Sequence, residues 1–256
     1  MADRMSLPPG YERRHFPEID STNEEAKRCA ERGEPGPIWI TADHQTAGRG
    51  RRGRTWVSPK GNLMTTLFLR PECSPAKAAE LSFVAGLALR DAVVHCAPSH
   101  QAEIALKWPN DLLIGGKKIA GMLLESAVSG PGNVAWLAIG IGLNLNAFPT
   151  ETPYPATSLL AATGVAPPVD MALSLLAAAF DKRLSLWRQE GFAPVREEWL
   201  THAAGRGRPI TVRLSNETID GVFETLEPDG ALRLKLADGG DRLISTGDVF
   251  FPSPKE

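Results

Sequence analysis

The sequence has 256 residues, of which 43% are hydrophobic and 23% charged, and its formal net charge is −2. These values are typical of a soluble globular protein with one large domain, or with one domain and a small appendage. They argue against a protein that holds nucleic acid through its overall charge, so a local concentration of positive charge points to a site.

The absence of targeting segments and the number of cysteines indicate where the protein acts and which state its thiols have. The sequence carries neither a secretory signal nor an apolar run of about 18–20 residues that could span a bilayer, so we expect a cytoplasmic protein with no membrane partner. The three cysteines, Cys29, Cys73 and Cys96, are odd in number and follow no metal-ligand spacing. Free thiols are therefore expected in place of a disulfide or a zinc site.

The N-terminal half of the chain predicts helices that alternate with strands. Residues 1–10 are polar and are expected to form a loose tail. Ser21 and Thr22 each precede a glutamate by three residues, which is the capping-box spacing and predicts a helix as far as about Gly33. A second helix, apolar on most sides and therefore buried, is predicted from the serine and proline at 74–75 to about residue 94. Strands are predicted at 11–16, 37–41 and 62–70.

Consecutive hairpins are predicted in the middle of the chain. The runs at 104–108, 112–114, 118–126 and 134–145 are rich in β-forming residues and are separated by turn residues. This pattern favours a mixed or largely antiparallel sheet. Residues 146–168 are rich in proline and threonine and are expected to form a long connection.

The last third of the chain predicts two helices and then a small β module. Asp170 is expected to cap the first helix, and the second covers about 192–202. From 209 to 251 short alternating runs predict about five strands, which we expect to close into a barrel because closure removes exposed sheet edges. The domain boundary is placed near 205–208. The helix that Asp170 is expected to cap has an apolar stripe at Leu173, Leu176, Phe180, Leu184 and Trp187.

The segment Gly48–Arg54 has the most unusual composition in the chain. Four arginines and three glycines occupy its seven residues. Guanidinium groups this close repel one another, and the glycines make the segment costly to order, so we expect it to close over an anionic ligand. A solvated basic loop is the alternative. The interleaved glycines and the flanking Gln45 and Trp56 favour a site, since arginines bind phosphates and an indole offers a flat surface to a base.

Three further motifs carry polar groups next to predicted strands. The turn Lys107–Asp111 could present an amide and a carboxylate to a metal–nucleotide ligand, or it could be a simple turn. Lys118 could point into a site above a low floor at Gly121, or it could be an exposed hairpin lysine. The run 140–144, Gly-Ile-Gly-Leu-Asn, marks close approach by a ligand or by backbone. A phosphate-loop motif, a nucleophile-elbow motif and a clustered His/Cys metal site are missing from the sequence.

Together these motifs resemble the biotin protein ligase family, and the resemblance spans roughly residues 11–251. It implies an α+β fold with a central mixed β-sheet and flanking helices, the biotin/lipoate ligase catalytic fold, followed by a small C-terminal SH3-like β-barrel. The implied domains are a flexible tail at 1–10, a catalytic domain at 11–206 and the SH3-like domain at 207–256.

Some members of the family carry an N-terminal DNA-binding domain and act as repressors. Because the Ser-Thr-Asn motif begins at Ser21, we expect the monofunctional type. The resemblance rests on 21–23, 45–56, 107–111, 118–121 and 140–144.

The resemblance also implies a reaction in two steps. Biotin and Mg-ATP give biotinyl-5′-AMP and pyrophosphate, and the acyl group then passes to a lysine of the biotin carboxyl carrier protein of a biotin-dependent carboxylase. Lys118 and Arg49 would be the catalytic cations, and Asp111 is the candidate ligand of Mg²⁺. The implied nucleotide-binding residues are Arg51, Arg54, Trp56, Asn110, Asp111 and Asn144. The implied biotin-binding residues are Ser21, Thr22, Asn23, Gln45, Arg49, Gly50, Arg51, Lys118, Gly121 and Gly140.

Two other functions compete with this hypothesis. Lipoate ligases share the catalytic fold, but the arginine–glycine segment and the turn 107–111 favour biotin. A nucleic-acid-binding module could use the basic segment and the barrel, but the net charge argues against it, and no nucleic-acid partner is expected. The oligomeric state is expected to be a monomer or a homodimer. We also predict that the arginine–glycine segment is poorly ordered without ligand, and that Arg51→Gly releases biotinyl-AMP early.

Overall fold

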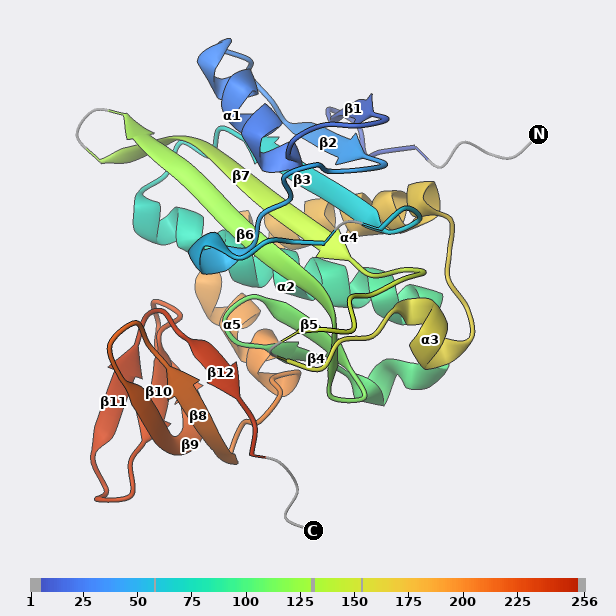
Figure 1. Ribbon diagram of the computed structural model, residues 1–256. Helices are drawn as coiled ribbons and strands as arrows, with labels where there is room; N and C mark the ends of the chain where they lie inside the picture. Colours follow the sequence, from blue (N-terminus) through green and yellow to red (C-terminus); the bar gives the residue numbers. More distant parts are fainter. Residues whose placement is uncertain (1–5, 58, 130–131, 153, 253–256) are drawn as a thin grey trace.

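The computed structural model describes residues 6–57, 59–129, 132–152 and 154–252, and its strands form two sheets (Figure 1). The larger sheet has seven strands in the order β1-β2-β3-β7-β6-β5-β4. β1 and β2 pair in parallel and the other neighbours are antiparallel, which confirms the predicted mixed sheet. Residues 1–5 of the predicted tail lie outside the described residues. The strands are β1 Glu12–Phe16, β2 Ile38–Ala42, β3 Leu63–Leu69, β4 Ile104–Lys107, β5 Asp111–Ile114, β6 Lys117–Ser129 and β7 Asn133–Leu143.

Helix α1, Thr22–Glu31, begins where the capping signal predicts. The Ser21 side chain accepts a hydrogen bond from the backbone N–H of Asn23, so Ser21 is the N-cap. α1 covers one face of the large sheet, where its Ala26 and Cys29 pack against apolar side chains of β2, β3 and β7. This packing brings the first turn of α1 close to the middle of the sheet.

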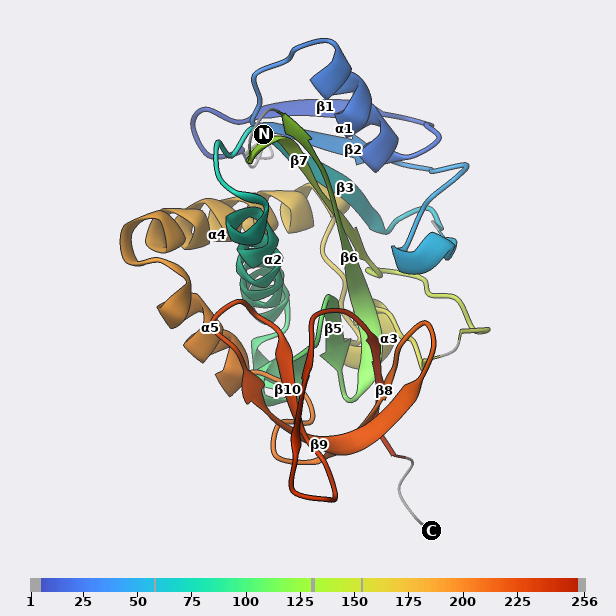
Figure 2. The same ribbon diagram turned by 90° about the vertical axis from the view of Figure 1, so that its left-hand side faces the viewer.

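The other face of the large sheet carries the main core beneath three helices (Figure 2). These are α2 Pro75–Cys96, α4 Val169–Glu190 and α5 Phe192–Thr201. Ser74 caps α2, Pro75 occupies its first turn, and most of the helix is buried, as predicted. The face that carries α1 thus stays partly available for a ligand, because the helices that build the core lie on the opposite face of the sheet.

Two predictions in the connection before α4 need correction. A short helix, α3 Leu159–Thr163, interrupts the predicted connection; the Ser158 side chain caps its start. The N-cap of α4 is Pro168, and Asp170 lies inside the first turn, where it pairs with Arg13 at 2.6 Å. The helix therefore starts earlier than expected, since proline fixes a φ that suits entry into a helix.

The second sheet forms a five-stranded antiparallel module next to α5 and β4 (Figure 1). The five strands confirm the predicted all-β module. In the described part of the module, β11 and β12 are the two edges of the hydrogen-bonded ladder, so the ladder itself does not close. Trp108 anchors the module to the large sheet by donating from Nε1 to the carbonyl of Gly230 at 3.1 Å. The strands are β8 Pro209–Arg213, β9 Thr218–Leu226, β10 Leu232–Lys235, β11 Asp241–Ile244 and β12 Asp248–Phe250.

The thiols and the helices bear on two smaller expectations. All three cysteines are free thiols, as predicted. Among the described residues, the helices are too short or too polar to cross a membrane.

Candidate active site

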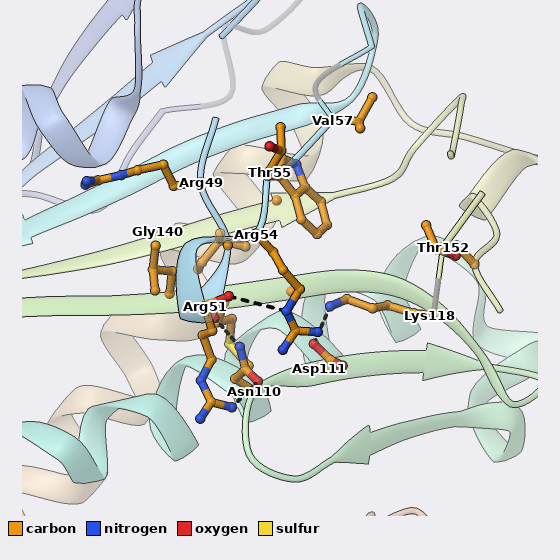
Figure 3. A pocket seen from close by; sticks show the side chains of 18 of the residues that line it. Arg49, Arg51, Arg54, Thr55, Val57, Asn110, Asp111, Lys118, Gly140 and Thr152 are labelled. Carbon is orange, nitrogen blue, oxygen red and sulfur yellow. Dashed lines mark hydrogen bonds and ion pairs between the residues drawn. The ribbon is translucent and has the colours of Figure 1, made fainter. Parts of the chain in front are cut away.

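A cavity of about 350 Å³ lies on the α1 face of the large sheet (Figure 3). It is bounded by the first turn of α1, the arginine–glycine segment, the turn after β4 and the start of β6. All the residues proposed from the sequence line this one cavity, although they come from segments far apart in the chain. They are Ser21, Thr22, Asn23, Gln45, Arg49, Gly50, Arg51, Arg54, Trp56, Asn110, Asp111, Lys118, Gly121, Gly140 and Asn144.

Glycines in the middle strands form the floor of the cavity. Gly140 and Gly142 lie two residues apart on β7 and therefore face the same side of the sheet. A Cβ at Gly140 would collide with the amide of Asn23, and one at Gly142 would collide with the indole of Trp56. Gly121 pairs with Gly142 across β6 and β7, and the indole lies close to it as well. The side chains of Asn23 and Trp56 can pack directly on the backbone of β6 and β7 only because these glycines lack a Cβ.

A chain of neutral hydrogen-bonding groups lies at the end of the cavity next to α1, where Thr22, Asn23 and Gln45 line the cavity and Thr66 is fully buried. Thr22 donates to Oε1 of Gln45 from both its backbone N–H, at 2.9 Å, and its hydroxyl, at 3.1 Å. The Thr66 hydroxyl lies 2.7 Å from the Thr22 hydroxyl and 2.6 Å from Oδ1 of Asn23. Because all four side chains hold one another, this end of the cavity is pre-organised.

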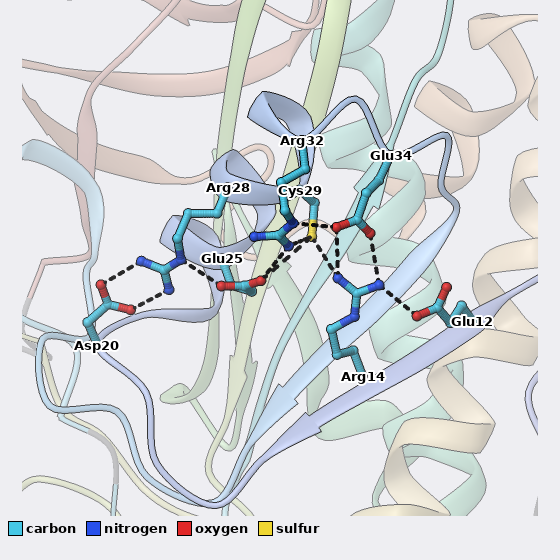
Figure 4. A network of polar contacts seen from close by, with 8 residues as sticks. All are labelled: Glu12, Arg14, Asp20, Glu25, Arg28, Cys29, Arg32 and Glu34. Atoms are coloured by element: carbon cyan, nitrogen blue, oxygen red, sulfur yellow. Dashed lines mark hydrogen bonds and ion pairs between the residues drawn. The ribbon is translucent and has the colours of Figure 1, made fainter.

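An ion-pair network holds α1 in place behind the cavity (Figure 4). The Asp20 carboxylate accepts from the backbone N–H of Ser21 at 2.7 Å and from both Nη atoms of Arg28. Arg28 also pairs with Glu25, at 2.6 Å. Burial alone would raise the pKa of Glu25, but hydrogen bonds from Arg28 and Arg32 outweigh burial and lower that pKa. The network fixes the residue that caps α1.

The opposite end of the cavity carries one carboxylate between two ammonium groups. Asp111 lies 2.5 Å from Nζ of Lys118 and 3.2 Å from Nζ of Lys107, through different carboxylate oxygens. Burial would raise the pKa of Asp111, but the two lysines outweigh it and hold that pKa below its usual range. Burial lowers the pKa of Lys107, whose ammonium lies 4.0 Å above the ring of Tyr154. The cluster has one positive charge in excess, which suits an anionic ligand.

The same cluster bears on the expected Mg²⁺ site at Asp111. Both oxygens of this carboxylate carry a lysine ammonium. In the part of the chain that the structure describes, no group of three or more His, Cys, Asp and Glu side chains is placed to hold a metal ion. The geometry therefore favours Asp111 as the counter-ion of the lysines, and the residues present do not fit a metal ion held by the protein.

The arginine–glycine segment is held by groups from three other elements. Arg49 points away from the lysine cluster and pairs with Glu24 at 2.6 Å and Glu125 at 2.9 Å (Figure 3). Arg54 donates from Nη2 to both carboxylate oxygens of Asp248 on β12, at 2.6 and 2.7 Å. Arg51 donates to Oδ1 of Asn110 at 3.1 Å, and burial lowers its pKa. Protein groups thus occupy the guanidiniums that were expected to meet phosphates.

The two predicted asparagines at this end also have protein partners. Asn144 is buried and donates from Nδ2 to the carbonyl of Thr157 at 3.1 Å. Asn110 donates from Nδ2 to the carbonyl of Met122. Both therefore shape the wall by holding backbone segments together.

Sequence reasoning missed several groups that belong to this site. Thr66 and Tyr154 lie in a predicted strand and in the predicted connection, and neither follows a motif. Glu125 comes four residues after the motif that ends at Gly121. Asp248 is 194 residues from Arg54, so nothing in the local sequence signals the pairing. Strand alternation could have found Glu125, since it places this residue on the same face as Gly121.

The two ends of the cavity suit different parts of one ligand. The α1 end offers fixed neutral donors and acceptors above a glycine floor. The lysine end offers positive charge in a partly buried setting, where it stabilises negative charge more strongly than it would in water. The arrangement fits a ligand that has a polar, uncharged head and an anionic group at its other end.

Comparisons with known proteins agree with this geometry. Residues 16–144 match the profile of the biotin/lipoate A/B protein ligase family, and residues 206–251 match the biotin protein ligase C terminal domain. The chain is 45% identical over 238 residues to the biotin–[acetyl-CoA-carboxylase] ligase of Paracoccus denitrificans, covering 91% of this chain and 97% of that protein.

Two solved structures are similar over almost the whole chain. The biotin protein ligase from Aquifex aeolicus in complex with biotin and ATP has a TM-score of 0.77 and 26% identity, covering 93% of this chain and 97% of that one. The biotin protein ligase from Leishmania major in complex with biotinyl-5-AMP has a TM-score of 0.62 and 28% identity, covering 93% and 100%. The fold expected from the motifs is confirmed by these neighbours.

Proposed function

We propose a function from one premise: the chain belongs to the biotin/lipoate A/B protein ligase family. The protein is an ATP-dependent ligase that attaches biotin to a carboxylase. The observation that carries this conclusion is the cavity, which joins a neutral hydrogen-bonding end to a lysine end over one glycine floor. Biotin has an uncharged ureido head and a carboxylate tail, and ATP supplies the phosphates, so the two substrates together match both ends.

The α1 end is proposed to bind biotin. Ser21, Thr22, Asn23 and Gln45 would surround the ureido head, with the backbone near Gly50 and Arg51 closing over it. Gly121 and Gly140 would let the ring system lie flat on the strands. A bicyclic, mostly apolar ligand needs such a slot and a few fixed hydrogen bonds.

The lysine end is proposed to carry the chemistry of the first step. An oxygen of the biotin carboxylate attacks the α-phosphorus of ATP, and the bond from that phosphorus to the pyrophosphate breaks. Two anionic groups must approach each other, and Lys118 and Arg49 would lower that repulsion and stabilise the charge that develops. Arg49 would first have to leave Glu24 and Glu125. Mg²⁺ enters the proposal as part of the Mg-ATP substrate.

The nucleotide is proposed to lie beside Trp56, Asn110, Asp111 and Asn144, with Arg51 and Arg54 over its phosphates. In the second step the amine of a carrier lysine attacks the acyl carbon of biotinyl-AMP, an amide forms and AMP leaves. The biotin carboxylate is the nucleophile of the first step and the carrier amine that of the second. No covalent protein intermediate is required.

We further propose that the partner is the biotin carboxyl carrier protein of a biotin-dependent carboxylase, that the protein acts in the cytoplasm as a monomer or homodimer, and that it has no DNA-binding role. A gel shift with duplex DNA tests the last point, and a salt-dependent shift would contradict it.

The test separates biotin from lipoate. The purified protein is incubated with Mg-ATP and either acid, and the acyl-adenylate is measured by mass spectrometry. We expect biotinyl-AMP with biotin and no lipoyl-AMP with lipoate. Failure to form the adenylate with biotin would overturn the proposal, and formation with lipoate alone would favour a lipoate ligase.

A further inference from the structure

Glu125 lies on β6, beyond every motif that led to the site. Side chains alternate along a strand, so Glu125 faces the same side of the sheet as Gly121 and Leu123, which line the cavity. Its side chain is about one third exposed, at 33%. It is therefore a charged group at the edge of the proposed biotin end, with no role in the reaction as described so far.

The carboxylate of Glu125 connects two segments of the site. Oε2 accepts a hydrogen bond from Nδ2 of Asn23 at 2.7 Å. Both oxygens accept from Nη2 of Arg49, at 3.1 and 2.9 Å. Glu24 pairs with the same guanidinium at 2.6 Å, but among the described residues its carboxylate forms no hydrogen bond with Asn23. Glu125 thus combines a contact to the arginine–glycine segment with a contact to the first turn of α1.

The carboxylate of Glu125, at 2.7 Å, and the backbone carbonyl of Leu123, at 3.4 Å, both accept from the nitrogen end of the Asn23 amide. A carboxylate accepts hydrogen bonds and donates none, so it selects the nitrogen end of the amide. Oδ1 of Asn23 then faces the Thr66 hydroxyl at 2.6 Å and lies over Gly140. Turning the amide would set its oxygen against the carboxylate. Asn23 is only 5% exposed, so water cannot compensate for such a turn.

The direction of the Asn23 amide affects the hydrogen bonds of its neighbours Thr66 and Thr22. Thr66 has one hydroxyl proton, and it lies between Asn23 and the Thr22 hydroxyl, which donates to Gln45. With Oδ1 of Asn23 as an acceptor, the Thr66 proton has two oxygens within reach, Oδ1 of Asn23 at 2.6 Å and the Thr22 hydroxyl at 2.7 Å. The orientation of the Asn23 amide therefore helps to order the donors and acceptors that would meet the ureido head.

We propose that Glu125 is a positioning residue for biotin, acting through Asn23. The inference rests on the proposed function, since it takes the α1 end as the biotin site. The carboxylate orients the Asn23 amide, so removing its charge weakens biotin binding while the chemistry on bound biotin is retained.

The first experiment compares Glu125→Gln with Glu24→Gln in the full chain. Each variant removes one carboxylate charge from Arg49, and only Glu125→Gln disturbs Asn23. Biotin affinity is measured by calorimetry without ATP. We expect Glu125→Gln to weaken binding about tenfold, the size of one charge-assisted hydrogen bond, and Glu24→Gln to change it by less than about twofold. Equal losses in both variants would place the effect on Arg49 and overturn the inference, and so would unchanged affinity in Glu125→Gln.

A kinetic split excludes a merely structural effect. In adenylate formation, Glu125→Gln should raise KM for biotin about tenfold and leave kcat at saturating biotin within about twofold. A fall in kcat with an unchanged KM would contradict a positioning role in biotin binding.

A double-mutant cycle tests whether Glu125 acts through Asn23. Asn23→Ala weakens biotin binding by itself, and adding Glu125→Gln should then cause no further loss. Additive losses would show that Glu125 acts independently and would overturn the inference. Thr66→Val disturbs the same chain without changing Glu125, and its loss should likewise be non-additive with that of Glu125→Gln.

The wild-type protein separates this inference from the proposed function. Wild-type protein that binds no biotin and makes no biotinyl-AMP would refute the proposed function. Wild-type protein that does both, beside a Glu125→Gln variant of equal affinity, would refute only the role of Glu125.

Discussion

A single buried carboxylate organises the charge at the reacting end of the cavity. Asp111 holds Lys118 and Lys107 within 3.2 Å, and it offsets one of their two charges. The remaining charge is fixed before a ligand arrives, so little reorganisation is needed when negative charge develops. This pre-organisation makes Lys118 the side chain whose loss should affect the first step most.

We expect Lys118→Met to slow biotinyl-AMP formation by about 10²–10³-fold, the range found when one fixed donor to a developing charge is removed. Asp111 keeps Lys107 as a partner, so the variant should still fold. Single-turnover adenylate formation measures the effect. Lys117→Met is the matched control, because Lys117 is the exposed neighbour on the same strand. A loss below about fivefold would show that Lys118 does not contact the reacting groups.

At the scale of elements, the N-terminus of α1 illustrates what local sequence can predict. The Ser-Thr-Asn run signalled both the start of a helix and a candidate site, and both depend on the same cap at Ser21. The ion pairs that hold α1 could not be predicted, because Arg14 and Glu34 meet only after β1 has paired beside β2 (Figure 4). Short-range signals thus place the helix, and tertiary pairing fixes it.

The ion pairs of Glu34 predict how stability depends on pH. Hydrogen bonds from Arg14, and then from Arg32, lower the pKa of Glu34 to about 2. A lowered pKa contributes stability above the unfolded value of about 4.3, and that stability is lost as pH falls through about 2. Glu34→Gln should lower the free energy of unfolding by about 1.5 kcal/mol at pH 7, and the difference should vanish near pH 2.

Urea titrations of the wild type and of Glu34→Gln at several pH values measure this difference. Glu31→Gln, at the exposed last residue of α1, is the control. A difference that stays constant between pH 7 and pH 2 would contradict the assignment to the Glu34 ion pairs.

The C-terminal module holds the arginine–glycine segment through ion pairs. Asp248 on β12 pairs with Arg54 at 2.6 Å and with Arg52 at 3.3 Å. Because these pairs join the segment to the C-terminal module, the module should control how freely the segment opens. The prediction that the segment is poorly ordered without ligand stays open and can be tested with the same variant.

We expect Asp248→Asn to speed amide hydrogen exchange across residues 48–56 about tenfold, because two charge-assisted contacts are weakened. Asp241→Asn is the control, since Asp241 pairs with Lys235 inside the module. In the wild type, exchange in this segment should slow when biotin and ATP are added. Unchanged exchange in Asp248→Asn would mean that the module does not restrain the segment.

At the scale of the whole molecule, the sequence located the site better than it located the contacts that assemble the site. The motifs were recognisable because each is continuous in sequence. Asp248 and Glu125 lie 194 and 76 residues along the sequence from their arginine partners. The periodicity of hydrophobic residues cannot predict pairings between residues so far apart in the sequence. The division into residues 11–206 and 207–256 likewise stays a prediction about domains.

Arg51 joins the two sheets through the arginine–glycine segment. Its guanidinium donates to Asn110 beside the large sheet, and to Thr246 at 2.8 Å and Gly247 at 3.3 Å beside β12. We expect Arg51 to help close the cavity, because it connects the turn after β4 to the C-terminal module. A closed cavity would keep water and foreign amines from the mixed anhydride until the carrier lysine arrives.

Arg51→Gly should consequently release biotinyl-AMP before transfer, because both connections are lost and a glycine adds backbone freedom. The free adenylate would acylate nearby lysines, so biotinylation of bystander proteins should rise several-fold at equal expression, measured by streptavidin blotting. Arg52→Gly is the matched control: it also adds a glycine, at a residue whose φ is already 55°, and removes a contact to Asp248, but it leaves Arg51 in place. If bystander labelling in Arg51→Gly does not exceed that of the wild type, the cavity is not kept closed by Arg51, and retention of the adenylate must depend on contacts made by the ligand itself.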